Sequence, residues 1–178
     1  KIHVCKDVSE PCALCRVFGR QSNLKGSQPT RIVLRDAFLT DESAKKLERL
    51  SLDLPYAEIK SENAIDRISS AATPRQIERV PSGATFDLEM LYSVLAQTKK
   101  QDVENFALVL ESLELLEDDY LGGQGSRGYG KVKLSFSLTW KDVSCYERGD
   151  VGEEISPMLS PREQLERFSS ATKPRLSV

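Results

Sequence analysis

The sequence predicts an α+β fold, in which an antiparallel sheet is covered by helices on one face. Two patterns support this prediction. Apolar residues alternate strictly with polar ones between 131 and 140, which is typical of a strand with one buried and one polar face. Between 101 and 119 they recur instead at helical spacing. The patterns follow one another as strand, strand, helix, strand, an order that suits a sheet with helices packed on one side.

The composition limits the class of protein before any motif is considered. The 178 residues are 39% hydrophobic and 29% charged, values typical of a soluble globular chain. No stretch approaches the roughly 18 apolar residues that a membrane helix needs, which excludes a membrane-spanning protein. The 4 cysteines are too few for a disulfide framework, and three of them lie within residues 5–15. We therefore expect a metal site and a cytoplasmic location, where thiols stay reduced.

Three further elements are expected from short local patterns. The β-branched run RIVLR at 31–35 predicts a strand. Residues 41–50 begin with acidic side chains and then carry apolar ones at helical spacing, which predicts a short helix. Residues 86–92 alternate for the most part as a strand does. These segments supply the remaining strands and helix of the expected sheet.

The C-terminal part contains a helix signal. Ser160, Pro161 and Glu163 combine an N-cap residue, a proline suited to the first helical position and the glutamate of a capping box. A short helix through Phe168 is expected, followed by a polar, frayed tail. Cys145 has no partner in the sequence and is expected to be an ordinary buried thiol.

The net charge of -2 is the sum of strongly segregated charges. Five basic residues and no acid lie between 16 and 35, and Lys25 is one of these five. Residues 100–119 carry seven acids and one base, whereas 120–133 carry three bases and no acid. Basic loops can therefore meet a polyanion locally, although the total charge is close to neutral.

Four potential metal ligands lie near the N-terminus. His3 and Cys5 are on the same side of an extended segment, and Cys12 and Cys15 have the spacing with which a tight turn binds one ion. The alternative is two buried thiols beside an unrelated histidine. We favour a structural Zn²⁺ ion, because the only histidine of the chain is among the four ligands and they fill all positions of a tetrahedron.

The segment 122–130 contains five of the chain's ten glycines. Glycine permits positive φ and close approach of the backbone, so successive amide groups in such a loop can form a concavity for phosphate. Nearby cations add charge, and a tyrosine can stack on a base. The lysine and hydroxyl are misplaced for a Walker loop, and the loop follows a helix, the reverse of a Rossmann fingerprint. A flexible connector or a helix C-cap is the alternative to phosphate binding.

Residues 58–81 carry apolar side chains on both sides of a small-residue centre, which predicts an extended hairpin or projecting loop. Its charges balance, and on composition alone a solvated hairpin is the simplest interpretation. The acids at 117–119 could bind magnesium, but a solvated helix end is the simpler account, although acids there oppose the helix dipole. Spacing alone therefore assigns no catalytic residue.

Taken together, these segments resemble members of the RAMP superfamily, specifically the backbone subunit of type III-A (Csm) CRISPR effector complexes. The resemblance spans roughly residues 3–140, and the glycine loop together with PRQIERVP is its most specific part. The matching segments are CRVFG (15–19), RIVLRDAF (31–38), EIKSENAIDR (58–67), PRQIERVP (74–81) and LGGQGSRGYGKV (121–132). The Cys/His segment resembles the zinc-bearing version of the family.

The resemblance implies a modified RNA-recognition-motif core of ferredoxin-like type, with a projecting thumb hairpin and a small zinc-bound insertion. Several copies would stack as a helical filament along the guide RNA, and each thumb would displace a nucleotide at a regular interval. The RNA-facing residues implied in the glycine loop are Gly122, Gly123, Gly125, Ser126, Arg127, Gly128, Tyr129 and Lys131. Those in the thumb are Arg67, Arg75 and Arg79, and weaker candidates are Arg16, Arg31 and Lys60.

The resemblance also implies that the complete protein is a metal-dependent endoribonuclease, which cleaves target RNA with Mg²⁺ or a similar divalent ion. The family's catalytic aspartate lies in an N-terminal part, with the first strand and first helix, that is absent from this chain. We therefore assign no catalytic residue. The expected partners are the CRISPR guide RNA, single-stranded target RNA, further copies of the chain and other Csm effector subunits, with no membrane.

We expect residues 1–140 to form an incomplete RAMP domain and 141–178 to be a C-terminal extension of the same domain. Within the first part, 1–20 would bind zinc, 58–82 would form the thumb and 121–131 would form the glycine-rich loop. Two alternatives stay open. One is a non-catalytic, structural RNA-binding RAMP subunit, and the other is a zinc-stabilised scaffold whose glycine loop binds a mononucleotide.

Overall fold

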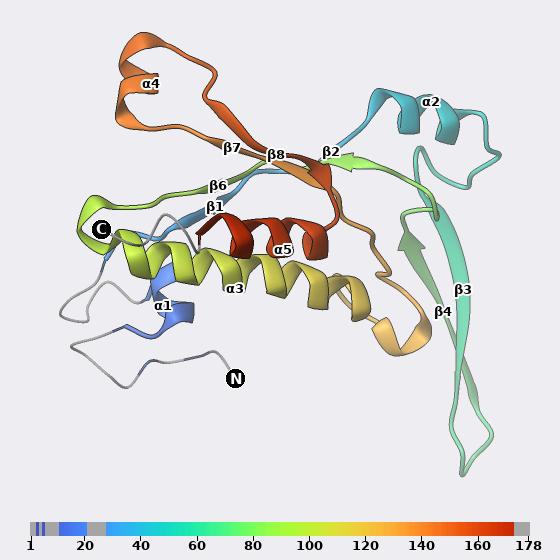
Figure 1. Cartoon of the computed structure of the whole chain (residues 1–178). Helices are drawn as coiled ribbons and strands as arrows, with labels where there is room; N and C mark the ends of the chain where they lie inside the picture. The colour runs from blue at the N-terminus through green and yellow to red at the C-terminus, as the bar shows by residue number, and fades with distance from the viewer. Residues whose placement is uncertain (1–2, 4, 6–10, 21–27, 173–178) are drawn as a thin grey trace. The chain divides into compact units, whose positions relative to one another are not determined.

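The computed structural model describes residues 3, 5, 11–20 and 28–172 (Figure 1). Lys25 and residues 173–178 of the tail expected to fray lie outside the described residues, whereas residues 169–172 of that tail belong to the last helix. The elements, with 3₁₀ helices labelled η, are α1 (Ala13–Phe18), β1 (Ile32–Leu34), β2 (Phe38–Leu39), α2 (Asp41–Glu48), β3 (Glu58–Ile65), β4 (Ala72–Arg79), β5 (Phe86–Asp87), β6 (Met90–Tyr92), η1 (Ala96–Thr98), α3 (Lys99–Asp118), η2 (Gly125–Arg127), β7 (Phe136–Trp140), α4 (Val143–Arg148), β8 (Glu153–Leu159) and α5 (Pro161–Thr172). Among the residues described, no helix has both the length and the apolar character needed to cross a membrane.

The α+β class is confirmed, although the described strands pair two by two and do not form one wide sheet. β1 pairs with β6, β2 with β5, β3 with β4 and β7 with β8. The last three of these pairs are antiparallel. The first three pairs are nested in the sequence, because β3 and β4 lie between β2 and β5, which in turn lie between β1 and β6.

Contacts divide the chain into two compact units. The first comprises Lys1–Ile32 and Tyr92–Val178, and the second comprises Val33–Leu91. The first unit therefore holds the cysteines and the glycine-rich loop, and the second holds the hairpin of β3 and β4. The division expected at residue 140 stays a prediction. β7 and β8 lie on either side of that boundary and pair with each other.

The core of the first unit contains the contact between two helices. Val109 and Leu110 of α3 are buried. The ring of Phe106 in α3 meets the ring of Phe168 in α5 edge-on, with centroids 5.1 Å apart. α5 runs beside α3 and also contacts β8, so it lies between α3 and the β7–β8 ribbon (Figure 1). The amphipathic helix predicted at 101–119 is therefore confirmed as α3, stabilised by burial of its apolar stripe.

The N-terminus of α5 is held by the predicted capping box. The hydroxyl and the backbone N–H of Ser160 donate to the carboxylate of Glu163 at 2.6 and 3.0 Å. These hydrogen bonds, the one from the hydroxyl first, lower the pKa of Glu163. The buried amide of Gln164 donates to the carbonyls of Phe136 in β7 and Pro157 in β8. The helix is thereby tied to both strands of the ribbon.

A buried ion pair joins the segment before β1 to the start of α3. Arg31 and Asp102 are 1% and 0% exposed, and Arg31 Nε donates to Asp102 Oδ1 at 3.0 Å. Asp102 Oδ2 accepts from the hydroxyl of Thr98 at 2.7 Å and from the N–H of Leu95 at 3.1 Å. Arg31 Nη1 donates to the carbonyl of Pro29 at 2.5 Å. The two buried charges are thus both paired and hydrogen-bonded, which offsets their desolvation.

In the second unit, the predicted helix at 41–50 is confirmed as α2. Thr40 caps it by accepting from the N–H of Ser43 at 3.2 Å. The hydroxyl of Ser43 accepts from the N–H of Thr85 at 2.8 Å, which ties the helix to the segment before β5. β3 and β4 form the predicted hairpin, in register from Glu58 opposite Arg79 to Ile65 opposite Ala72 (Figure 1).

Two predicted strands are shorter in the structure. The strand expected at 86–92 is interrupted between β5 and β6. The alternating segment 131–140 becomes a strand only at Phe136, and just before it the backbone N–H of Leu134 donates to the carboxylate of Glu117 at the end of α3. No sequence pattern predicted α1, β2, α4 or β8. Cys145 in α4 is only half-buried, so the expectation of a buried thiol is wrong.

Candidate metal centre and nucleic-acid interface

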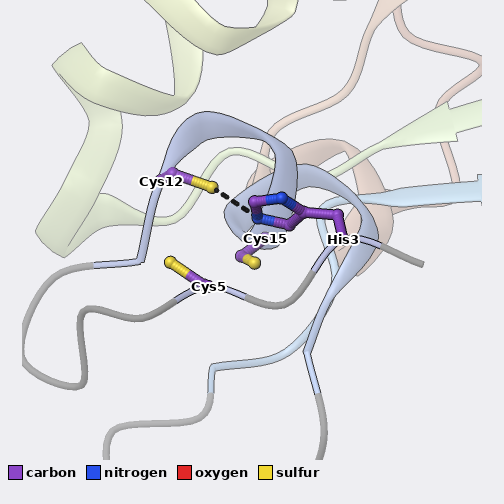
Figure 2. A group of neighbouring side chains, drawn as sticks. All are labelled: His3, Cys5, Cys12 and Cys15. Carbon is purple, nitrogen blue, oxygen red and sulfur yellow. Dashed lines mark hydrogen bonds between the residues drawn. The ribbon is translucent and has the colours of Figure 1, made fainter. Parts of the chain in front are cut away.

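The four expected metal ligands converge in the first unit (Figure 2). Cys12 immediately precedes α1 and Cys15 lies in its first turn, so the start of this helix positions both sulfurs. His3 Nε2 is 3.3 Å from Cys12 Sγ, and the four potential ligand atoms all lie within 4.8 Å of one another. Cys15 is buried and Cys5 is half-buried, whereas His3 and Cys12 are exposed.

The geometry of this cluster fits a tetrahedral ion. With Zn–S distances of about 2.3 Å and Zn–N distances of about 2.0 Å, the ligand atoms of such a site are roughly 3.3–3.8 Å apart. Small side-chain movements bring ligand atoms that already lie within 4.8 Å of one another to that separation. The cysteines are free of disulfides, and a set of three sulfurs and one imidazole nitrogen is typical of zinc. The cluster could therefore hold a metal ion.

The surroundings of Cys15 favour its protonated thiol when no cation is near. Burial raises the pKa of Cys15 to about 11, and hydrogen bonds with Cys12 and Cys5 add to the shift. Thiolates close together disfavour one another for the same electrostatic reason. A bound cation replaces the protons and compensates the negative charge. Metal affinity at this cluster is therefore expected to fall as the pH falls.

The glycine-rich loop connects α3 with the segment leading to β7. Gly122, Gln124, Gly128 and Gly130 all have left-handed backbone conformations, with φ of +84°, +63°, +79° and +78°. Left-handed residues between right-handed ones turn successive amide groups toward one side, which is how anion-binding concavities are built. The backbone of the loop is therefore suited to accept an anion.

Two of the loop glycines are required by close packing. A Cβ on Gly125 would lie 1.9 Å from a ring carbon of Tyr120. A Cβ on Gly130 would lie 2.3 Å from the carbonyl oxygen of Leu121. The N–H of Leu121 donates to the carbonyl of Gly130 at 2.8 Å, which closes the base of the loop. A flexible connector would not need such contacts, so the loop has a defined shape.

The loop borders an open cavity of about 560 Å³. Arg127 is exposed beside it and donates to the side-chain oxygen of Gln124 at 3.2 Å. The cavity is lined by Asp118, Asp119, Tyr120, Gln124, Gly125, Ser126, Gly128, Tyr129 and Lys131. Lys131 Nζ donates to the backbone carbonyl of Glu117. The lining combines polar groups with two aromatic rings, a combination that suits a polar ligand with planar groups.

Two of the thumb arginines are ion-paired across the hairpin. Arg75 Nη2 lies 2.8 Å from a carboxylate oxygen of Glu62, and Arg79 Nε lies 2.5 Å from one of Glu58. Both pairs are on the same face of the hairpin, because their positions along each strand differ by four residues. Arg67, in the turn, is exposed and pairs with no acid in the described part of the chain.

The tip of the hairpin is an ordered turn. Asp66 Oδ1 accepts from the N–H groups of Ile68 and Ser69 at 2.9 and 2.7 Å. The Ser69 N–H is the main cause of the lowered pKa of Asp66. This turn presents Ile68, which is 97% exposed. An apolar side chain displayed in this way is suited to contact a partner.

Two of the weaker RNA-binding candidates are buried. Arg31 is committed to Asp102, and an approaching phosphate would have to break this ion pair. Arg16, in α1, is only 6% exposed. Both arginines therefore lie in the core of the first unit, and their expected contact with RNA stays a prediction. Lys60 is half-buried in β3.

Sequence reasoning missed two residues that shape the loop. Tyr120 packs on Gly125, and Glu117 accepts hydrogen bonds from two groups after the loop. Only weak features of the sequence pointed to these two residues. Tyr120 is close to the glycine run, and Glu117 is an acid at a helix C-terminus, where it opposes the helix dipole.

The fold and the two candidate sites can now be compared with known proteins. Residues 2–133 match the family model described as RAMPs, the RAMP superfamily. The chain belongs to the RAMP superfamily.

Relatives within this family share a single name, CRISPR system Cms endoribonuclease Csm3. The protein of this name from Methanothermobacter thermautotrophicus is 42% identical over 155 residues, which cover 80% of this chain and 61% of the relative. The one from Methanocaldococcus jannaschii is 36% identical over 159 residues, covering 87% of this chain and 60% of the relative. The one from Streptococcus thermophilus is 46% identical over 119 residues, covering 67% of this chain and 52% of the relative.

The expected resemblance to the Csm backbone subunit is therefore confirmed. The chain spans between 52% and 61% of the length of these three curated relatives.

Proposed function

We propose that the chain is the guide-RNA-binding part of a filament subunit in a type III CRISPR effector complex. The main support is its identity of 36–46% to relatives named as CRISPR endoribonucleases. The closed glycine loop adds a physical reason, because its backbone is shaped for an anion. The partners of the complete protein would be guide RNA, single-stranded target RNA, further copies of the subunit and other Csm subunits.

Within this proposal the glycine loop contacts the phosphate backbone of the guide. Its amide groups would supply hydrogen bonds and Arg127 would supply charge, while Tyr129 would be placed to stack on a base. The hairpin would contact RNA through Arg67 and the apolar tip at Ile68. Arg75 and Arg79 would join these contacts only if they exchanged their glutamate partners for phosphate.

Binding of single-stranded RNA to a filter tests the proposal directly. The chain should retain RNA, and retention should weaken as salt rises because phosphate contacts release counterions. Arg127→Ala should reduce the affinity, whereas Arg148→Ala, which removes an exposed arginine of α4, serves as the matched control. Failure of the unchanged chain to retain RNA would favour the alternative of a mononucleotide-binding scaffold.

We also propose that the Cys/His cluster binds a structural zinc ion, with all four ligands supplied by the protein. The donor set and the spacing of the ligand atoms support this assignment. Elemental analysis of the purified chain should give one zinc per chain. A value well below one, unchanged after dialysis against zinc, would rule out a closed four-ligand site.

The complete protein is proposed to cleave target RNA with Mg²⁺ or a similar divalent ion. No residue of this chain is assigned to that chemistry. The alternative, a non-catalytic RNA-binding subunit, therefore differs from this proposal only in the part of the protein that would carry the catalytic residue. Cleavage of a target RNA at regular intervals, present with Mg²⁺ and abolished by EDTA, would distinguish the two. An assembled complex that binds target RNA and leaves it intact under both conditions would support the non-catalytic alternative.

A further inference from the structure

The chain at the end of the glycine loop is hydrogen-bonded to a single residue of α3, Glu117. Glu117 lies in the last turn of this helix, which ends at Asp118. Its backbone carbonyl accepts a hydrogen bond from Lys131 Nζ. Its carboxylate accepts from the N–H of Leu134 at 2.5 Å. Because Lys131 ends the loop and Leu134 follows it, the returning chain is held against the helix from which the loop departs.

A third hydrogen bond joins the two ends of the loop to each other. The N–H of Leu121 donates to the carbonyl of Gly130 at 2.8 Å. Tyr120 then packs against Gly125, at a distance that leaves no room for a side chain there. The residues between Leu121 and Gly130 are thus anchored at their base, and Glu117 fixes the chain just beyond it. Such anchoring prepares a loop for a ligand before the ligand arrives.

The end of α3 gives a physical reason for each of these contacts. The last carbonyls of a helix have no partner within the helix, and a lysine that donates to one of them also complements the helix dipole. A glutamate at this end is electrostatically unfavourable by itself. Glu117 gains a compensating interaction, because its carboxylate accepts from the Leu134 N–H. The ammonium group of Lys131 is engaged with the protein through one of its three N–H donors.

We propose that Glu117 and Lys131 are positioning residues, which hold the glycine loop in its RNA-binding shape, and that Lys131 makes no phosphate contact. This inference rests on the proposed function of the loop. It replaces the expectation from the family resemblance that Lys131 faces the RNA.

The salt dependence of RNA binding separates a positioning lysine from a phosphate ligand. Each phosphate contact on a single strand contributes about 0.7 to the slope of log K against log salt. Lys131→Ala should weaken binding about tenfold at fixed salt, through a less ordered loop, with an unchanged slope. Arg127→Ala should reduce the slope by about 0.7. Lys133→Ala removes an exposed lysine two positions further along and is the matched control, expected to change neither quantity.

Glu117 is tested by a conservative and a disruptive substitution. Glu117→Gln keeps an oxygen that accepts from the Leu134 N–H, so it should preserve RNA affinity. Glu117→Ala should weaken binding to the same extent as Lys131→Ala, again at constant slope. Hydrogen exchange of the Leu134 amide reports the contact itself, and it should accelerate in Glu117→Ala but not in Glu117→Gln.

Two results would overturn the inference. One is a slope that falls by about 0.7 in Lys131→Ala, which would make this lysine a phosphate ligand. The other is unchanged Leu134 exchange and unchanged RNA affinity in Glu117→Ala. If the unchanged chain bound no RNA, the proposed function would fail first. The exchange rate of Leu134 would then still decide whether the two residues hold the loop.

Discussion

Arg31 and Asp102 form an ion pair that is almost fully removed from water. Desolvation of two charges is costly, and their attraction and hydrogen bonds offset that cost without adding much stability. The loss of one partner is different, because the remaining charge stays buried and unpaired. The pair therefore controls stability mainly through the penalty for breaking it.

Asp102→Ala should lower the free energy of unfolding by about 3–5 kcal/mol, since it leaves the Arg31 guanidinium uncompensated. The double substitution Arg31→Met with Asp102→Leu should recover much of this loss. Urea unfolding measures both. Glu89→Ala breaks the exposed Arg35–Glu89 pair and should cost less than about 1 kcal/mol. A loss for Asp102→Ala no larger than for this control would contradict the prediction.

Asp142 gives the N-terminus of α4 a dependence on pH. The hydroxyl of Ser144 and the N–H of Cys145 donate to its carboxylate and lower its pKa to about 2. A carboxyl whose pKa is lower in the folded state stabilises that state above its ordinary pKa of 3.8 and loses this effect as the pH falls toward 2. The start of α4 should therefore loosen between pH 4 and pH 2.

The amide proton shift of Cys145 in NMR spectra follows this transition. In Asp142→Asn the side chain still accepts hydrogen bonds but does not titrate in this range, so the shift should stay nearly constant from pH 4 to pH 2. An unchanged titration in this variant would assign the pH dependence to another group.

At the level of elements, the β3–β4 hairpin carries arginines whose charge is neutralised locally. Glu62 and Glu58 hold Arg75 and Arg79 along one face. Exposed pairs of this kind contribute little to stability. Under the proposed function, these ion pairs determine how much positive charge the hairpin presents to RNA.

Glu62→Ala should raise the affinity for single-stranded RNA, because it frees Arg75, while stability changes by less than about 1 kcal/mol. Fluorescence anisotropy with a labelled RNA measures the affinity. Glu78→Ala removes the same charge from the same hairpin on the opposite face, where no arginine of the described residues is paired with it, and is the matched control. An equal gain in both variants would mean that only net charge matters.

The elements that could be predicted from sequence are those with local signals. The capping box at Ser160 and the apolar stripe of α3 are complete within a few turns, and both were found. The start of β7 could not be placed, because the backbone N–H of Leu134 donates to the Glu117 carboxylate and not to a neighbouring strand. β8 was missed for a related reason, since pairing with β7 and contact with α5 define it.

The candidate sites follow the same rule. The convergence of the four potential metal ligands was predicted, because their chemistry and spacing are contained in a short segment. The burial of Arg31 was not, because Asp102, its partner, is distant in the sequence. Whether a basic residue faces solvent depends on such tertiary contacts, and charge patterning does not reveal it.

At the scale of the whole molecule, the two units bury few hydrophobic side chains. Among the described residues, those buried are Cys15, Val17, Leu47, Val109 and Leu110. Others are widely exposed in both units, including Phe38 at 71% and Leu115 at 61%. Surfaces with so much exposed apolar area are typical of proteins that meet partners. This agrees with the proposal that the chain functions within an assembly.

Removal of the proposed zinc should affect the two units differently. α1 carries Cys15, and its Val17 carbonyl accepts from the N–H of Arg31 at 2.9 Å, so the ligand segment is linked to the first unit's core. After chelation, amide exchange should accelerate at Cys15 and Arg31, while amides of β3 and β4 keep their protection. Hydrogen-exchange mass spectrometry measures both. Equal loss of protection in the hairpin would show that the units do not unfold independently.

Pro74 has a consequence for how neighbouring hairpins behave. The Asp66 N–H bonds to the Ala71 carbonyl, so by the alternation of antiparallel pairs Asn63 and Pro74 form a non-hydrogen-bonded pair. The nitrogen of Pro74 therefore points to the outer edge of β4, where it offers no donor. A foreign strand cannot extend the sheet along that edge without losing a hydrogen bond. The β3–β4 hairpins of neighbouring molecules are therefore less able to pair edge to edge and aggregate.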